Sequence, residues 1–341
     1  MPIAKHFHRT AVAPIAGHLT ILLALLAGLS GAAVAPPVRG LSAGATVGAQ
    51  TTDAPVRLLV AADHEIRNER EWSRGLSLVV SEAEDLLFPS LGRPLEVVRT
   101  VPWQGSVRQP SADPLLHDLM DSVPRGESDI VVGFVRAYSF QAYSDTGARV
   151  RGLANYRNAY TVIMLGGPIG DHQTPISGIA SLLAHELAHV FGAVHRSGED
   201  LLLAPGGVGT RIDALSAALI GMHRERTFGT VSFPLPAPYR EAARPLYRRA
   251  IAEDPSNLDA RLMLARLDVE TGRYEEAISA LESILAEFPG NLEAREDLNL
   301  ARRLRNHDAN TAALGLGVQG RSVGQLLPLG CFDQGKVGAC S

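Results

Sequence analysis

Hydrophobic positions in the first two thirds of the chain follow two periods, and together these predict strands and helices. Short runs rich in Val, Ile and Leu predict buried or half-buried strands. They fall at 56–60, 95–101, 129–137 and within 152–165. From Glu69 to about Leu87, apolar residues recur at helical spacing and predict a long amphipathic helix; a short one is expected over 114–122. Ser177 is a good N-cap and begins another helix. Strands and helices in this order indicate the α/β (α+β) class.

The last third of the chain has a longer period. Pro255 and Pro289 are 34 residues apart, and each ends a similar stretch. The residues between them predict two helices with a turn at Gly272. A helix–turn–helix unit of this length that ends in proline resembles the tetratricopeptide repeat. A half repeat before it (240–254) and a helix after it (292–305) make a small all-α segment, which we expect to lean on the first domain or on a partner.

These patterns divide the chain into two folded domains with flexible segments around them. The larger domain spans 55–227, and a proline-rich linker at 228–238 joins it to the helical repeats at 239–307. The remaining segments are a linker at 36–54 and a Gly-rich tail, expected to be extended, at 308–341.

The first 35 residues predict a targeting segment. No Lys, Arg, Asp or Glu occurs from 10 to 38, and the stretch contains a continuous apolar core. This pattern is typical of a cleaved export signal, but residues 15–35 are also just long enough for an uncleaved membrane anchor. Either interpretation places the folded domains outside the cytoplasm, in a secreted, periplasmic or anchored protein. An exported chain permits a disulfide between Cys331 and Cys340, although two free thiols in a frayed tail are the alternative.

Charge excludes one class of partner. The 341 residues carry a net charge of −4, with 46% hydrophobic and 20% charged residues. A nucleic-acid-binding protein needs a basic surface, so we expect no nucleic acid partner.

The stretch from His185 to His195 carries the chemistry. It reads H-E-x-x-H-x-x-G-x-x-H. His185 and His189 share one helix face, and Gly192 can end the helix so that His195 turns back toward them. Three imidazoles leave a fourth position on a metal ion for water, whose proton Glu186 can take. We therefore predict Zn²⁺ held by the three histidines; the alternative is a buried amphipathic helix with incidental histidines.

This motif resembles the zinc signature of the metzincin clan of metallopeptidases, and the order of strands and helices in 55–227 is similar to the order in that clan. The opening stretch from Leu58 to His64 looks like the adamalysin/matrixin-like members. The resemblance implies a mixed twisted sheet with a long backing helix and an active-site helix. It also implies a zinc endopeptidase that hydrolyses peptide bonds through a zinc-bound water, with Glu186 as general base. The protein or peptide substrate would lie along an edge strand within 152–165.

One departure from the clan concerns the turn beneath the metal. The clan has a methionine there, whereas the best match here places Leu203 at that position and Pro205 two residues later. Leu and Met are similar in volume, so the exchange usually costs less than about 1.5 kcal/mol. These residues are the predicted equivalent of the methionine turn.

A second class of function stays open. The repeat-like segment could bind a protein partner outside the cytoplasm while the zinc site is structural or vestigial. The two functions could also be combined, with the repeats recruiting a protein substrate. Glu186 favours the enzyme, because a structural zinc site needs no base. Tyr156 and Tyr160 could stabilise an oxyanion, although tyrosines in strands are more often packing residues. Asp200 could hold the turn or orient a ligand, although an ordinary acid in a surface loop is the other interpretation.

Overall fold

The computed structural model describes residues 54–105, 112–136, 151–172, 174–198, 200–204, 209–228 and 234–313. The predicted export signal or anchor, both cysteines and Pro205 lie outside these ranges. Within them, no helix combines the length and apolar character that crossing a bilayer requires.

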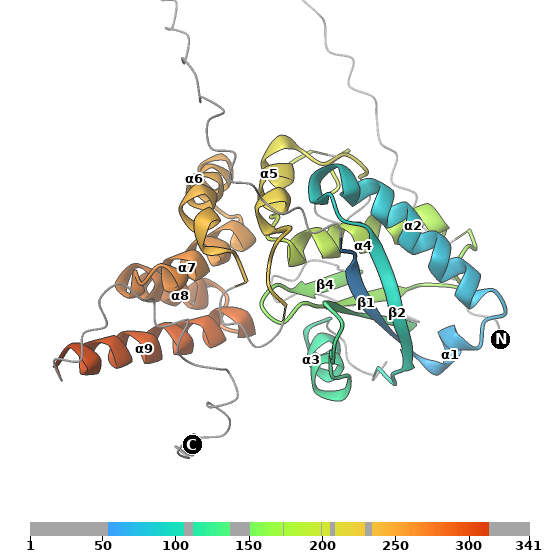
Figure 1. The fold of residues 1–341 in the computed structure, drawn as a ribbon, viewed down its shortest axis with the longest axis horizontal. Coiled ribbons are helices and arrows are strands. Elements are labelled where there is room, and N and C mark those ends of the chain that lie inside the picture. The colour runs from blue at the N-terminus through green and yellow to red at the C-terminus, as the bar shows by residue number, and fades with distance from the viewer. Residues whose placement is uncertain are drawn as a thin grey trace, which may run out of the picture. The chain divides into compact units, whose positions relative to one another are not determined.

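A five-stranded mixed sheet forms the centre of the larger domain (Figure 1). Its strands are β1 (Val56–Ala62), β2 (Leu95–Pro102), β3 (Ile130–Arg136), β4 (Gly152–Asn155) and β5 (Tyr160–Leu165). They lie in the order β2-β1-β3-β5-β4, and all pairs are parallel except β4 with β5. The predicted α/β class is therefore confirmed.

The single strand expected within 152–165 is two strands of a hairpin. Asn155 makes the turn between them, because its side-chain oxygen accepts from the backbone N–H of Asn158 and its carbonyl accepts from the N–H of Ala159. Ala159 takes a φ of 59°, which reverses the chain. As a result, β4 runs antiparallel to β5 and is one of the two edge strands of the described sheet, with β2 at the other edge.

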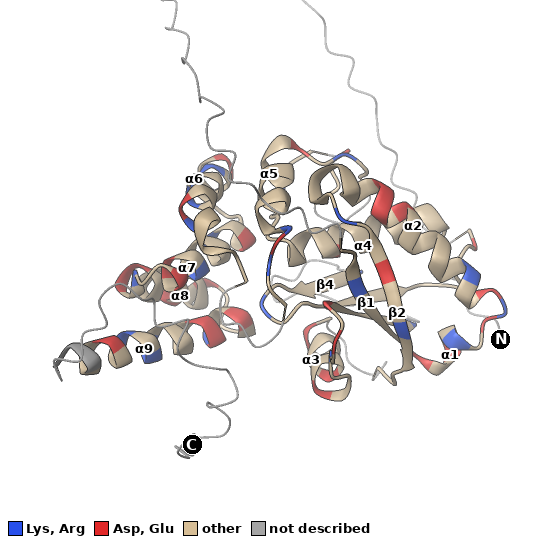
Figure 2. Ribbon diagram, viewed as in Figure 1, with Lys and Arg blue, Asp and Glu red and all other residues tan. Residues whose placement is uncertain are grey.

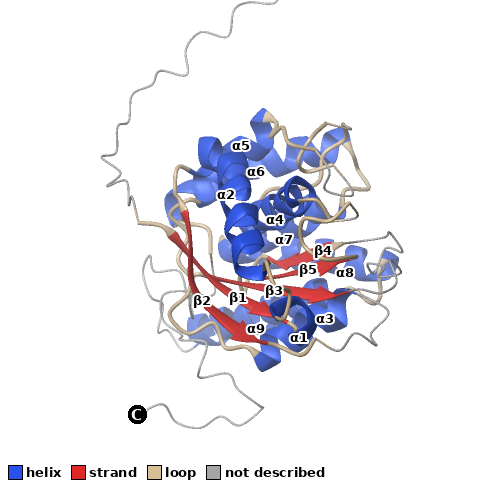
Figure 3. Ribbon diagram, turned by 90° about the vertical axis from the view of Figure 1, so that its right-hand side faces the viewer, coloured by secondary structure: helices blue, strands red, loops and turns tan. Residues whose placement is uncertain are grey.

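Helices cover both faces of the sheet (Figure 3). On one face, α2 (Trp72–Leu91) and α4 (Ile176–Val190) pack against alternate strand residues such as Leu58 and Val60. On the other, α3 (Ala112–Ser122) packs against Leu59 and its neighbours. Burial on both faces explains why β1, β3 and β5 are nearly continuous apolar runs, whereas β2 at the sheet edge is mostly exposed. The larger domain also contains two shorter helices, α1 (His64–Arg67) and α5 (Ala214–His223).

The last third of the described chain forms four helices, of which the last three share an apolar core of their own. They are α6 (Ala237–Glu253), α7 (Leu258–Glu270), α8 (Tyr274–Glu287) and α9 (Leu292–Ala313). Figure 2 shows acidic and basic residues on α6, α7 and α9, whereas the charged residues of α8 are all acidic. The proline-rich linker is shorter than expected, because Pro236 caps α6 and Pro238 lies in its first turn, where proline is tolerated. The predicted extended tail is helical through Ala313, because no Gly or Pro interrupts the chain before Gly315.

The repeat helices share a second apolar core with the larger domain. Tyr156, Val194 and Leu219 from the larger domain pack in one cluster with Tyr247 and Met263 from α6 and α7. At the edge of this junction Asp297 pairs with both Arg157 and Arg266, and the side chain of Asp297 is almost fully buried. The repeat-like segment therefore packs against the larger domain. This is the first of the two arrangements expected from the sequence, the other being packing against a partner.

Candidate metal centre

Helix α4 brings the first two histidines of the motif together. His185 and His189 are one turn apart near its C-terminal end, and their rings meet edge to face with centroids 4.7 Å apart. The helix ends in a Schellman motif: the N–H of Gly192 donates to the carbonyl of His189, and the N–H of Ala193 donates to that of Ala188. Gly192 has a φ of 77°, the left-handed conformation predicted from its place in the motif.

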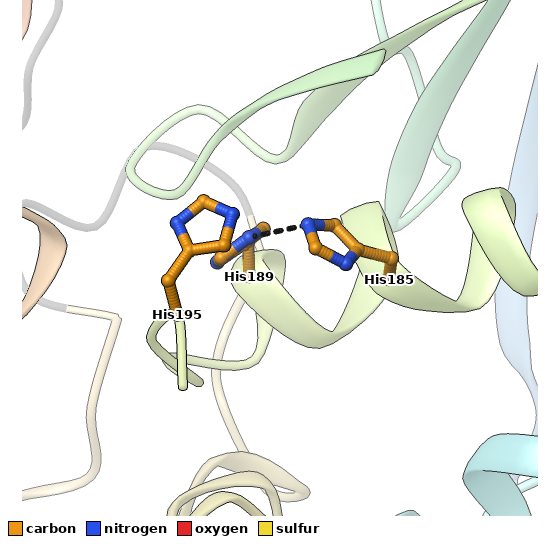
Figure 4. A group of neighbouring side chains, drawn as sticks. All are labelled: His185, His189 and His195. Atoms are coloured by element: carbon orange, nitrogen blue, oxygen red, sulfur yellow. Dashed lines mark hydrogen bonds between the residues drawn. The ribbon is translucent and has the colours of Figure 1, made fainter. Parts of the chain in front are cut away.

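The chain beyond that turn places His195 against the other two histidines (Figure 4). Its ring centroid lies 5.2 Å from that of His185 and 4.6 Å from that of His189. Each residue offers one ligand atom, and the three atoms lie within 4.8 Å of one another. The three predicted ligands thus come together at one point.

Each ring nitrogen that faces away from this point has a hydrogen-bond acceptor. Nδ1 of His185 lies 2.6 Å from the carbonyl oxygen of Leu202, and Nδ1 of His189 lies 3.0 Å from that of Ala193. Nδ1 of His195 pairs with a carboxylate oxygen of Asp259. An acceptor at Nδ1 places the ring proton there and leaves Nε2 as the unprotonated ligand atom.

This donor set fits a zinc ion. The Nε2 atoms of His185 and His189 lie 3.0 Å apart, and two bare lone pairs at that distance repel each other. A shared proton, drawn as the dashed line in Figure 4, or a cation between the rings removes the repulsion. Zinc–nitrogen bonds of about 2.1 Å in a tetrahedral arrangement separate ligand nitrogens by roughly 3.4 Å, so this pair would have to open only slightly to hold the ion.

Burial and mutual repulsion keep the first two ligands neutral. Burial, with the neighbouring His189 and His195, lowers the pKa of His185 well below its ordinary value, and it lowers the pKa of His189 to about 4. Burial would also lower the pKa of His195, but the charge and hydrogen bond of Asp259 outweigh it and raise that pKa. At neutral pH the two helix histidines therefore need no deprotonation before a metal binds.

Glu186 is buried beside the triad, next to the edge strand. An added Cβ at Gly152 would lie 2.5 Å from its Oε1, so the carboxylate reaches the backbone of β4. Burial raises the pKa of Glu186 to about 8 in the metal-free protein. A cation held by the histidines would lower it again, because a nearby positive charge favours the carboxylate.

The segment after the third histidine passes beneath the triad. Leu203 is fully buried in the main core, and its carbonyl accepts from the N–H of Arg196 at 2.9 Å. The neighbouring Leu202 donates its N–H to the carbonyl of Arg211 and supplies the acceptor for His185. Leu203 therefore lies in the segment that contacts His185 through Leu202, and its equivalence to the methionine turn stays a prediction.

The other candidates have structural partners away from the triad. The Tyr156 hydroxyl lies 2.9 Å from Nε2 of His223, and the Tyr160 hydroxyl donates to the carbonyl of Val123. Both tyrosines are buried, in agreement with the packing interpretation. Asp200 binds the guanidinium of Arg211 with both oxygens, at 2.7 and 3.1 Å, and so holds the surface loop.

Asp259 is the residue near the site that the motif did not predict. It lies 64 residues beyond His195, in the first turn of α7. An acidic residue two positions after an N-cap is usually explained by the helix dipole, so the local pattern gives no indication of a histidine partner.

Comparisons with known proteins cover the two parts of the chain separately. A family model described as tetratricopeptide repeat matches residues 240–302, which confirms the repeat resemblance. No curated protein matches the sequence. Among solved structures, archaemetzincin from Methanopyrus kandleri is similar with 19% identity and a TM-score of 0.36, over 50% of this chain and 96% of its own. A zinc-dependent peptidase from Methanocorpusculum labreanum has 14% identity and a TM-score of 0.34, over 48% and 99%. Archaemetzincin from Archaeoglobus fulgidus has 13% identity and a TM-score of 0.32, over the same shares.

Proposed function

We propose that the larger domain is a zinc-dependent endopeptidase of the metzincin type. The observation that carries this proposal is the convergence of three histidines, each with an acceptor on Nδ1, beside one buried glutamate. A purely structural zinc site is usually closed by four protein ligands. The three histidines are the metal-ligating set among the described residues, so a fourth position is left for water or substrate.

His185, His189 and His195 would hold the metal, and Glu186 would handle the protons. A zinc ion at this place supplies Lewis acidity, which acidifies water and polarises a peptide carbonyl. Glu186 accepts the proton of the attacking water and delivers it to the leaving amine nitrogen. Its burial supports this role, because a carboxylate shielded from solvent exchanges its proton with the reacting groups rather than with bulk water.

The edge strand supports an extended peptide as substrate. Because β4 is an edge strand of the described sheet, no other described strand pairs with its outer side, where a substrate could add as a further strand. Gly152 in β4 lies against Glu186, so a peptide paired with β4 passes close to the proposed base. Main-chain pairing of this kind accepts many sequences, and it favours endopeptidase activity over the trimming of chain ends.

The alternative is an interaction protein with a vestigial metal site. The tetratricopeptide match at 240–302 supports a protein partner, because such repeats usually bind other proteins. The two functions are compatible if the outer surface of the repeats recruits a substrate. An exported location, secreted, periplasmic or membrane-anchored, remains part of the proposal and rests on residues 1–35 alone.

The test is metal-dependent cleavage of unstructured protein. Full-length chain is incubated with casein and with a mixed peptide library, as purified, after chelation, and after return of one equivalent of zinc. We expect internal bonds to be cut, the cutting to stop on chelation, and zinc to restore it. Cleavage that survives complete removal of metal, or no cleavage by zinc-loaded protein, would argue for the interaction protein.

A further inference from the structure

We propose that Asp259 of the helical repeat is a positioning residue for His195, so that the repeat is a working part of the metal centre. The inference rests on the proposed zinc site and names the residue that completes it. One carboxylate oxygen of Asp259 accepts from Nδ1 of His195 and lies 3.4 Å from the backbone nitrogen of the same residue. The neighbouring Asn257 donates to the carbonyl of His195 at 2.8 Å. The ring, the backbone N–H and the carbonyl of His195 therefore all contact residues at the start of α7.

The three histidines differ in how their own surroundings hold them. His185 and His189 lie on α4, and their Nδ1 acceptors are the carbonyls of Leu202 and Ala193 in the chain just beyond that helix. His195 lies outside any helix, and its side chain is 38% exposed. A loop histidine loses much rotational freedom when it binds a metal, unless another contact has already oriented it. Asp259 supplies that contact from a distant part of the sequence.

Asp259 is itself held in place. Asn257 caps α7 by accepting from the N–H of Ala260 at 2.9 Å, so the first turn of the helix has a defined geometry. Two contacts tie the repeat to the chain beside the metal site. The Tyr247 hydroxyl donates to the carbonyl of Gly192 at 3.0 Å, and Arg196 pairs with Glu253 at 2.5 Å. Both contacts come from α6, and α7 is held with it because Ala260 and Met263 of α7 pack in one apolar cluster with Tyr247 and Val194. The position of Asp259 therefore determines the orientation of the His195 ring.

A carboxylate on the far nitrogen of a metal-binding histidine fixes the tautomer and raises the basicity of the ligand atom. Loss of such a partner typically weakens metal binding 10- to 100-fold. The repeat therefore does more than support the larger domain or recruit a partner. Any displacement of α7 would be expected to loosen the third zinc ligand.

The experiment compares zinc affinity in full-length variants. Asp259→Ala removes the acceptor, and Asp259→Asn keeps an acceptor oxygen without the charge. Glu287→Gln is the matched control, because it also neutralises one carboxylate that pairs with α7: Glu287 of α8 pairs with Arg261 at 2.6 Å, and no contact joins this pair to His195 among the described residues. Zinc affinity is measured by competition with a chromophoric chelator, the Co²⁺-substituted site by its visible absorption, and folding by thermal unfolding of the metal-free protein.

We expect a zinc Kd weaker by about 10- to 100-fold and a changed Co²⁺ spectrum for Asp259→Ala, a loss of a few-fold for Asp259→Asn, and wild-type values for Glu287→Gln. A folded Asp259→Ala protein with wild-type Kd and spectrum overturns the inference. If that variant does not fold, Asp259→Asn decides: wild-type affinity contradicts the proposal, and weakened affinity supports it. Failure of the wild-type protein to bind zinc would instead refute the proposed function.

Discussion

The backbone of Gly152 lies directly against the carboxylate of Glu186. A Cβ at this glycine would come within 2.5 Å of Oε1 and within 2.8 Å of both Cδ and Cγ. The edge strand and the proposed base are therefore in van der Waals contact, with no room for a side chain between them. This contact links the strand that would pair with substrate to the group that would move the proton.

The first prediction concerns that contact. In Gly152→Ala the new methyl group must displace either β4 or the Glu186 side chain, so we expect kcat/KM for peptide cleavage to fall at least about 10-fold, since small displacements of a reacting group are costly. Zinc content should not change, because no ligand is touched. Gly178→Ala is the control: it lies on α4, and its Cβ would meet only Pro175 at 3.4 Å. Equal activity of the two variants would mean that the base tolerates movement.

The second prediction concerns the turn that returns His195 to the site. Gly192 has a φ of 77°, and a Cβ there would lie 2.3 Å from the ring of His223. Gly272 has nearly the same φ, 76°, with nothing within 4 Å. Gly272→Ala should therefore reduce the unfolding free energy by only about 1–2 kcal/mol, the cost of placing a residue with a Cβ in the left-handed conformation.

Gly192→Ala should lose about 1–3 kcal/mol more, because the ring is packed and must move. Urea unfolding of the two variants measures the difference. Equal losses would show that His223 moves aside without cost.

The third prediction uses the buried His223. Burial and the charge of Arg226 lower its pKa to about 3, from an ordinary 6.5. Between these values the unfolded chain binds a proton that the folded chain does not, so stability falls as the pH falls through this window. The loss from pH 7 to pH 5 is about 2 kcal/mol for one such group.

His223→Gln removes that loss. Unfolding by urea is measured with chelator present, so that the three histidines of the candidate site titrate alike in the wild type and the variant. The difference in pH dependence of the unfolding free energy between the two proteins then reports on His223 alone. The variant should be less acid-sensitive than the wild type by about 2 kcal/mol over this interval. Parallel pH profiles would contradict the assignment of a buried, neutral imidazole.

The fourth prediction concerns Leu203, which follows the residue that contacts His185. It is fully buried in the main core, so Leu203→Ala should reduce the unfolding free energy by about 2–5 kcal/mol. Leu203→Met should cost less than about 1.5 kcal/mol and leave the zinc Kd unchanged, because Met fills a similar volume. Thermal unfolding and chelator competition test both variants. Loss of zinc in the Met variant would show that this turn differs from the metzincin turn.

Local patterns predicted the elements that lie close together in sequence. The strand runs, the long helix after Glu69 and the turn at Gly192 each depend on residues a few positions apart, where periodicity and backbone preference act directly. The division of 152–165 into β4 and β5 was not predicted, because one asparagine and a residue with positive φ decide it.

Contacts between distant segments could not be read from spacing. His195 and Asp259 are 64 residues apart, and each has an ordinary local explanation as a motif residue and as a helix-start acid. Only the packing of α7 against the chain beyond Gly192 brings them together. The motif therefore predicted the three converging histidines but not the carboxylate that pairs with the last of them.

The central claim is a zinc-dependent peptidase in which Glu186 moves the proton. Glu186→Gln keeps the size of the side chain and removes the base, so the decisive measurement is zinc content and kcat/KM for one cleaved peptide, beside wild type. We predict one zinc per chain in both proteins and a fall in kcat/KM of about 100- to 10,000-fold in the variant. A zinc-loaded Glu186→Gln protein that cleaves at the wild-type rate would contradict the account.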